Sequence, residues 1–245
     1  IIMNDLARDI GLMNTNFTNS TGMFHENNYS TVYDIALLSR YLINKFPNYY
    51  HLFAETEFEW SGIKQNNRNP LLYKEMGADG LKTGHLSASG YGLAASAVQE
   101  GRRLISVTNG FSSSKKRSQG SARLLTWGFR EFTNINIGQA GEIFSEIEIP
   151  LAKKMVQVTP SQNIKVTVSK ANKDKIIQNI RVVPNISAPL PTGSVVATLE
   201  VVLSDNEKMN FNLETVNEVE KTGIIGRFFS FVINLITSLF SIIFS

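Results

Sequence analysis

The chain has 245 residues, of which 42% are hydrophobic and 18% charged, and this excludes a disordered, collagen-like or coiled-coil protein. It has no cysteine and three scattered histidines, so thiol chemistry, disulfides and Cys- or His-based metal sites are not expected, and we predict no cofactor. A net charge of +3 is too small to indicate nucleic-acid binding.

The first residues show a helical pattern. Ile2, Leu6 and Ile10 recur at helical spacing and are followed by Gly11, which predicts the C-terminal end of a helix. Because the sequence opens inside this element, we expect the chain to be a fragment of a longer protein.

A longer helical pattern covers residues 31–46. Thr31 is placed to cap its first turn, and Pro47 cannot continue it. The apolar face that we expect to pack on the core consists of Ile35, Leu38 and Leu42.

Two β-prone runs and another helix complete the first half. Residues 91–98 and 103–108 flank a Gln-Glu-Gly-Arg segment, which predicts a β-hairpin. Residues 118–132 predict a helix. Its expected buried stripe consists of Leu124, Leu125 and Phe129.

The pattern changes near Gly138. Between Gly138 and Lys221, short alternating segments are separated by Pro, Asn, Asp and Gly, which is typical of a small all-β, sandwich-like module. The sequence therefore predicts an α+β protein with domains at 1–137 and 138–222 and an apolar C-terminal segment at 223–245.

Asp79–His85 carries the motif with the clearest chemistry. It reads Asp-Gly-Leu-Lys-Thr-Gly-His and lies between an Asn-rich extended stretch and the predicted hairpin. K-T-G is one of three motifs of serine β-lactamases and penicillin-binding proteins, beside S-x-x-K and S-D-N. Because three residues alone are a weak signal, the surrounding segments decide how much weight the motif carries.

Four segments together resemble one family. Asp79–His85, Ser30–Arg40, Asn66–Asn69 and Ala188–Gly193 are similar to serine-type D-alanyl-D-alanine carboxypeptidases, the low-molecular-mass penicillin-binding proteins of peptidase family S11. The resemblance covers about residues 3–222. It implies a partial β-lactamase/transpeptidase-like α/β domain, which is followed by a β domain that acts as a spacer.

The resemblance also implies a reaction. In this family an activated serine attacks the carbonyl of the penultimate D-Ala of a peptidoglycan stem peptide, the terminal D-Ala leaves, and water then hydrolyses the acyl-enzyme. Lys82 would supply a cation, Thr83 a hydroxyl for the substrate carboxylate, and Gly84 room for the substrate backbone. The backbone N–H of His85 would be an oxyanion-hole donor. β-Lactams are expected to bind the full-length form.

Arg68 and Arg117 resemble arginines of the family near the carboxylate end of the site. Arginine suits this role because it pairs with carboxylates in bidentate fashion. For each of them an ordinary surface arginine remains the alternative. We expect the His85 imidazole to have a structural role, and we expect His25 and His51 to be surface or boundary residues without a catalytic role.

The nucleophile is the missing element. The formal matches to S-x-x-K are Ser61–Lys64, Ser112–Lys115 and Ser113–Lys116, and those to S-x-N are Ser161–Asn163 and Ser204–Asn206. S-x-x-K requires a buried helix N-terminus where both side chains share one face. The first match is in turn-like sequence, the next two follow K-T-G, and the S-x-N matches lie in predicted hairpin turns, so we reject all five.

Two interpretations follow. The first is a truncated carboxypeptidase, inactive alone, whose serine and lysine lie outside these residues. The second is a catalytically dead, membrane-tethered protein that binds peptidoglycan or a partner protein. A β-lactamase is disfavoured by the β module and by the C-terminal segment.

Residues 224–245 contain a single charged residue, Arg227. Placed on a helical wheel, their polar residues fall within about 100° of arc, which favours an amphipathic helix lying in the membrane surface over a spanning helix. The residues that we expect to form this anchor are Arg227, Phe228, Phe231, Leu235 and Phe240. Together with the resemblance, this predicts a peripheral protein on the periplasmic side of the bacterial inner membrane.

Overall fold

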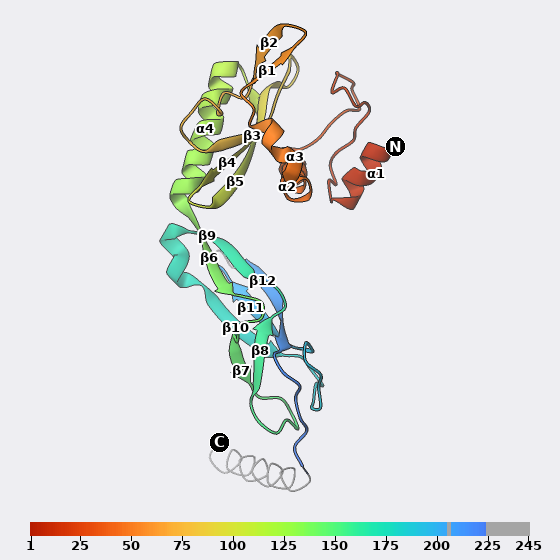
Figure 1. Cartoon of the computed structure of the whole chain (residues 1–245), viewed down its shortest axis with the longest axis vertical. Coiled ribbons are helices and arrows are strands. Elements are labelled where there is room, and N and C mark those ends of the chain that lie inside the picture. Colours follow the sequence, from red (N-terminus) through yellow and green to blue (C-terminus); the bar gives the residue numbers. More distant parts are fainter. Residues whose placement is uncertain (205–206, 224–245) are drawn as a thin grey trace. The chain divides into compact units, whose positions relative to one another are not determined.

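The computed structural model describes residues 1–204 and 207–223 (Figure 1). The chain divides into two compact units, Ile1–Glu131 and Phe132–Ser245. The division lies six residues before the predicted boundary at 138, because strand β6 (Phe132–Gly138) pairs with β9 of the second unit. The predicted anchor residues 224–245 lie outside the described residues.

Two helices of the first unit, α1 (Ile2–Asp9) and α2 (Val32–Lys45), lie where the sequence predicts them. The short helix α3 (Pro47–Tyr50) and the 3-10 turn η1 (His51–Phe53) follow α2 and were not predicted. Gly11 follows α1 with φ +84°, which confirms the predicted glycine at the helix end. The Thr31 side chain accepts a hydrogen bond from Asp34 N at 3.1 Å and caps α2.

Two β-structures lie in the first unit. The strands are β1 (Glu57–Trp60), β2 (Ile63–Asn66), β3 (Ala78–Leu86), β4 (Gly90–Gln99) and β5 (Arg102–Phe111). β1 and β2 form a separate hairpin, and β3–β4–β5 form an antiparallel sheet in that order. The predicted hairpin of residues 91–108 is therefore confirmed as β4–β5, with Glu100 and Gly101 both at positive φ in its turn.

Two helices cover the two faces of this sheet (Figure 1). α4 (Ser114–Glu131) packs Leu125 against Leu93 and Ala95 of β4, while α2 lies on the other face. Leu125 and Phe129 belong to the buried stripe as predicted, but Leu124 is exposed because it lies on the outer side of the helix.

The second unit is an all-β module. Besides β6, its strands are β7 (Ser145–Ile147), β8 (Val156–Pro160), β9 (Ile164–Ser169), β10 (Ile177–Val182), β11 (Val195–Val202) and β12 (Lys208–Thr215), with a 3-10 turn η2 (Lys170–Lys175). Five strands form a sheet in the order β10-β11-β12-β8-β7, and β6 pairs with β9. Alternate residues of β8 and β9, together with Val196, Ala197, Leu199 and Val201 of β11, bury one continuous apolar core, so the predicted sandwich-like module is confirmed.

Candidate active site

The K-T-G motif lies on an edge strand. β3 pairs with β4 on one side only, with Lys82 opposite Ala94, and no described strand pairs with its outer edge. Lys82, Gly84 and His85 are exposed, and Lys82 Nζ donates a hydrogen bond of 2.7 Å to the Thr83 carbonyl. An unpaired edge of this kind can accept an extended peptide by backbone hydrogen bonding.

Gly84 and its cross-strand partner Gly92 differ in what surrounds them. A Cβ at Gly92 would lie 2.7 Å from Asn109 Oδ1 and 3.2 Å from the Thr108 carbonyl oxygen, so the Asn109 side chain and the neighbouring backbone would have to shift to admit it. A Cβ at Gly84 would meet no atom within 4 Å among the described residues. The space beside Gly84 is therefore available to a group from outside the described chain.

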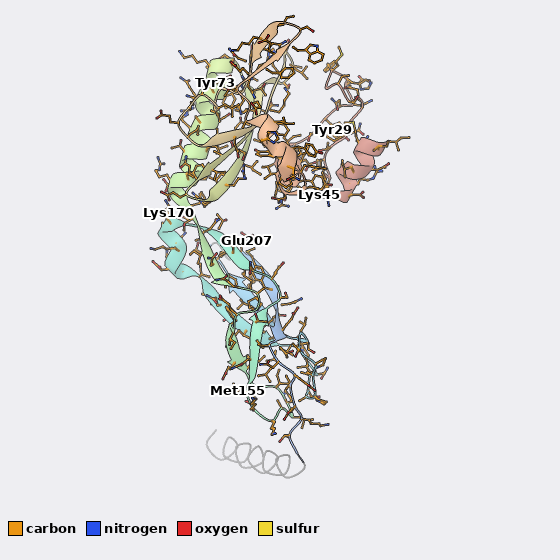
Figure 2. All side chains as sticks on the ribbon, in the orientation of Figure 1. Tyr29, Lys45, Tyr73, Met155, Lys170 and Glu207 are labelled. Atoms are coloured by element: carbon orange, nitrogen blue, oxygen red, sulfur yellow. The ribbon has the colours of Figure 1, made fainter. Side chains whose placement is uncertain are left out.

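A cavity of about 660 Å³ lies beside the motif. Lys82, Thr83 and Gly84 line one wall, and the loop carrying Tyr29, labelled in Figure 2, lines another. The predicted apolar face of α2 also borders this cavity, and for this reason its residues are only half-buried. These residues are Ile35, Leu38 and Leu42.

Asn69 fixes the start of β3, a role that the sequence reasoning missed. Its side chain is 1% exposed, and its Nδ2 donates to the Gly80 carbonyl at 2.8 Å. Its Oδ1 accepts from Leu71 N at 3.1 Å, and its own N–H donates to Asn67 Oδ1 at 2.9 Å. The Asn-rich run was the available signal, since asparagine commonly hydrogen-bonds nearby backbone.

A second polar cluster holds the same strand from the α2 side. Arg103 pairs with the Asp79 carboxylate at 2.6 Å and donates to Ser96 Oγ at 2.6 Å. The Tyr50 hydroxyl donates to Asp79 Oδ1 at 3.2 Å, and the Arg103 guanidinium lies 5.1 Å from the centre of the Tyr50 ring. Burial raises the pKa of Tyr50 to about 12.

The structure brings the two candidate arginines together but places them differently. Arg68 is exposed, whereas Arg117 is 6% exposed and is therefore not an ordinary surface residue. Arg117 Nη2 donates to Ser114 Oγ at 3.1 Å and approaches the Arg68 carbonyl at 3.5 Å. Burial lowers the pKa of the Arg117 guanidinium below its usual value, and the neighbouring Tyr91 hydroxyl opposes that shift.

The formal matches to S-x-x-K have structural roles elsewhere. Ser61 is at positive φ in the β1–β2 turn, and Lys64 forms an ion pair with Glu57 at 2.8 Å. Ser113 caps α4 by accepting from Lys116 N at 3.2 Å. Lys82 lines the cavity beside the K-T-G motif, and none of these serines lines it.

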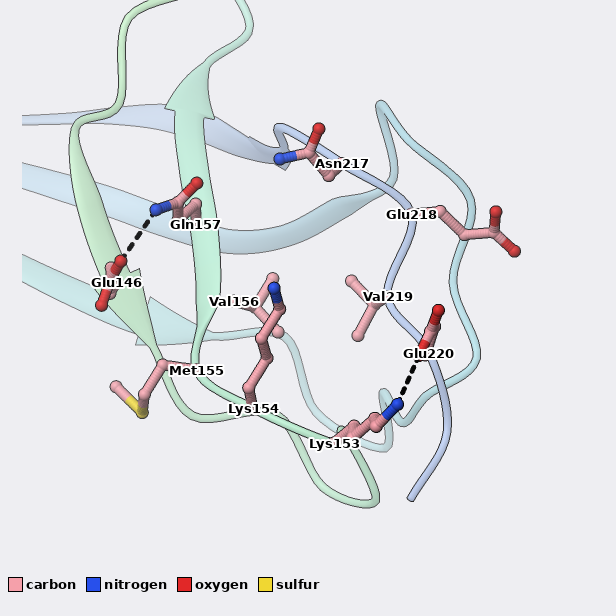
Figure 3. A pocket seen from close by; sticks show the side chains of 10 residues that line it. All are labelled: Glu146, Lys153, Lys154, Met155, Val156, Gln157, Asn217, Glu218, Val219 and Glu220. Carbon is pink, nitrogen blue, oxygen red and sulfur yellow. Dashed lines mark hydrogen bonds and ion pairs between the residues drawn. The ribbon is translucent and has the colours of Figure 1, made fainter. Parts of the chain in front are cut away.

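The second unit holds a different kind of cavity, of about 720 Å³ (Figure 3). Lys153 and Glu220 neutralise each other in an ion pair of 3.1 Å, and the Glu146 carboxylate accepts a hydrogen bond of 2.9 Å from Gln157. No residue of the K-T-G motif lines it, and neither candidate arginine does.

Comparison with known proteins places the chain in a family. The profile described as D-alanyl-D-alanine carboxypeptidase matches residues 1–113, and the one described as penicillin-binding protein 5, C-terminal domain, matches residues 132–221. The D-alanyl-D-alanine carboxypeptidase DacD of Francisella tularensis matches at 30% identity with a TM-score of 0.69, over 90% of this chain and 68% of that one. The chain belongs to the D-alanyl-D-alanine carboxypeptidase family.

Two further relatives support this assignment. The chain is 34% identical to D-alanyl-D-alanine carboxypeptidase DacA of Haemophilus influenzae, over 98% of its own length and 62% of the relative's. The solved structure of penicillin binding protein 5 from Haemophilus influenzae superposes with a TM-score of 0.79, covering 90% of this chain and 65% of that one. The chain therefore spans less than two thirds of the length of these two relatives.

Proposed function

We propose that this chain forms the K-T-G half of the active site of a serine D-Ala-D-Ala carboxypeptidase that trims peptidoglycan stem peptides. The observation that carries the proposal is the outer edge of β3 at Lys82–Gly84, which no described strand pairs with and where Lys82 and Gly84 are exposed, with open space at Gly84 and a cavity beside it. A peptide ending in D-Ala-D-Ala fits such an edge because it can align with β3 as an added strand.

Each residue has a role in this proposal. Lys82 supplies a fixed positive charge beside the reacting serine, and the Thr83 hydroxyl and Arg68 receive the terminal carboxylate. The backbone N–H of His85 contributes to the oxyanion hole, where one donor is worth about 3–4 kcal/mol in acyl transfer. Arg117 adds positive charge behind Arg68.

The nucleophilic serine and its lysine would come from sequence outside these 245 residues. The cavity beside K-T-G is bordered by the half-buried apolar face of α2, so an apolar segment placed there would cover that face and meet Lys82. The chain alone is then expected to bind the peptide without forming an acyl-enzyme.

The test uses the 245-residue chain and two synthetic ligands. Titration with diacetyl-L-Lys-D-Ala-D-Ala, followed by NMR, is expected to shift the amide signals of β3, whereas the peptide with a C-terminal amide binds more weakly. Gly84→Val should abolish the shifts because its side chain fills the open space, while leaving the fold intact. Absence of binding by the unsubstituted chain would contradict the proposal.

A labelled penicillin separates an enzyme fragment from a binding protein. The chain alone should remain unlabelled, and a fusion that adds the S-x-x-K and S-x-N segment of a relative should become covalently labelled. Penicillin-binding protein D2 from Listeria monocytogenes, whose solved structure matches with a TM-score of 0.50, carries ampicillin. Labelling of the chain alone would refute our rejection of its own serines.

Because none of the S-x-x-K matches in this chain is acceptable, a second candidate function is also favoured. A catalytically inert protein that binds peptidoglycan or a partner protein would use the same edge strand and the same arginines. It predicts peptide binding by the chain but no labelling of the fusion, since its K-T-G side would no longer support acylation.

We further propose that the protein is held peripherally on the periplasmic face of the bacterial inner membrane by residues 224–245. The support is the one-sided polar stripe of the sequence, with Phe228, Phe231, Leu235 and Phe240 on the apolar side. No helix of the described residues is long and apolar enough to span a bilayer.

Liposome flotation tests the proposed anchor. The full chain should float with the liposomes even in 1 M salt, where the Debye length is about 3 Å, and a chain ending at residue 223 should not float. Release by salt would contradict anchoring by apolar burial.

A further inference from the structure

A stacked column of three side chains links the K-T-G strand to Arg117. Tyr91 of β4 pairs with His85 of β3 and with Phe111 of β5. The Tyr91 and His85 rings lie 3.9 Å apart at an angle of 33°, and the Arg117 guanidinium lies 5.7 Å from the centre of the Tyr91 ring. The Tyr91 ring therefore contacts both the residue of the proposed oxyanion donor and a buried cation.

Arg117 occupies an unfavourable place for a cation. It lies in the first turn of α4 beside Lys115 and Lys116, where the helix dipole is positive and where no acidic residue is present. It is also nearly buried, and its Nε has no hydrogen-bond partner within the described chain. A buried charge without a carboxylate partner needs other contacts to stay in place.

The contacts that remain are few and specific. Ser114 Oγ and the Arg68 carbonyl each accept from Nη2, and the Tyr91 ring offers its electron-rich face to the guanidinium. The ring is the contact that connects Arg117 to the sheet, since the two hydrogen bonds go to its own helix and to the loop after β2. Without the ring, the guanidinium loses its support on the side facing β3 and β4.

We propose that Tyr91 is a positioning residue that holds Arg117 behind Arg68, so that the exposed Arg68 guanidinium can receive the terminal carboxylate of the substrate. The inference rests on the proposed function for its ligand, but not for the placement of Arg117. In this arrangement Arg117 fixes the Arg68 backbone and contributes positive potential, and Arg68 makes the contact.

The test compares Tyr91→Ala with Tyr91→Phe. Phenylalanine keeps the ring face, so Tyr91→Phe should bind diacetyl-L-Lys-D-Ala-D-Ala within twofold of the unsubstituted chain. Tyr91→Ala should weaken that binding about tenfold, as expected for a desolvated cation–π contact. Binding of the C-terminal amide should be unchanged in both variants, because it carries no carboxylate for the arginines.

A second readout needs no ligand. Hydrogen exchange of the Arg117 Nε–H, measured by NMR, should be slow in the unsubstituted chain and in Tyr91→Phe, and fast in Tyr91→Ala. Tyr33→Ala, at an exposed tyrosine of α2, is the matched control and should change neither readout. If Tyr91→Ala fails to fold, Tyr91→Leu replaces it, since leucine fills space without a ring face.

The outcomes separate the two proposals. The role of the ring would be overturned if hydrogen exchange of the Arg117 Nε–H were unchanged in Tyr91→Ala. It would also be overturned if Tyr91→Phe weakened binding of the carboxylate peptide, relative to its amide, as much as Tyr91→Ala does. If the unsubstituted chain binds neither peptide, the proposed function fails, and the exchange comparison still decides whether Tyr91 positions Arg117.

Discussion

The two units of the chain are of similar length but are stabilised in different ways. In the second unit, fifteen buried apolar residues form one cluster, whereas the buried cluster of the first unit consists of Leu71, Leu93, Ala95, Ala97 and Leu125. Of the nine buried polar residues of the described chain, seven lie in the first unit. The first unit also carries most of the exposed large apolar side chains, including Phe58 and Trp60.

This difference shows what each unit can do alone. A module that buries its apolar residues in one core can fold by itself. A unit with a small core and a wide exposed apolar surface is expected to be less stable and to associate with other apolar surfaces. The second unit is stabilised by its own core, while the first exposes an edge strand and a cavity to which further groups can be added.

The largest expected effect comes from removing core volume in the second unit. Leu199 is fully buried within the large cluster, and Leu199→Ala should lower the free energy of unfolding of that unit by about 4 kcal/mol, within the usual range for such a cavity. The matched change Leu71→Ala in the first unit should cost only about 2–3 kcal/mol, because the smaller core can relax around the gap. Urea unfolding of both variants measures this, and equal losses would remove the distinction between the cores.

A smaller effect separates two glycines of the first unit. Gly92→Ala should destabilise the fold by about 1–3 kcal/mol, because the new Cβ meets Asn109 and the Thr108 carbonyl. Gly84→Ala should leave stability unchanged or slightly improved, since alanine costs less backbone entropy than glycine. Thermal unfolding compares the two. A large loss in Gly84→Ala would mean that the site strand is shaped by packing within the chain and not by an external ligand.

The sequence predicted the second unit more fully than the first. Strands β7 to β12 follow alternating patterns with turn residues between them, so the pattern that defines each strand is local. β6 was missed although Asn134–Ile137 alternate polar and apolar residues; only its pairing with β9 is a long-range choice that the local pattern does not contain. The boundary was accordingly placed six residues too late.

In the first unit the motif was predictable and its supports were not. K-T-G, the hairpin β4–β5 and the caps of α2 are local features. The contacts of Asn69 with Gly80, of Arg103 with Asp79 and of Tyr91 with Arg117 join residues more than ten positions apart, and residue type alone does not predict them. The half-burial of Ile35, Leu38 and Leu42 was also not predictable, because helical periodicity gives the face but not what lies against it.

The polar cluster of the first unit should make its stability sensitive to high pH. The pKa of Tyr50 is raised to about 12 in the folded chain, against about 10 in the unfolded chain. Below pH 10 the phenol is protonated in both states, and between pH 10 and 12 only the unfolded state loses its proton, so stability falls as pH rises. The expected loss is roughly 1–2 kcal/mol after allowance for solvent screening.

Urea unfolding at pH 9 and at pH 11 measures this loss. Tyr50→Phe should flatten the pH dependence, even though it also loses the hydrogen bond to Asp79 at neutral pH. Tyr33→Phe, at an exposed position, should keep the slope of the unsubstituted chain. If Tyr50→Phe shows the same pH dependence as the unsubstituted chain, the Tyr50 cluster does not make the first unit sensitive to high pH.

The smallest effect concerns the ion pair in the second unit. Lys153 and Glu220 are both largely exposed, so their attraction is screened by water and salt and is worth about 0.2–1 kcal/mol. Lys153→Met should therefore cost less than 1 kcal/mol, and the cost should vanish in 1 M salt (about 3 Å Debye length). Lys154→Met removes the same charge from the same cavity and controls for the change in net charge. A loss approaching that of Leu199→Ala would mean that charge contacts, and not its apolar core, stabilise the second unit.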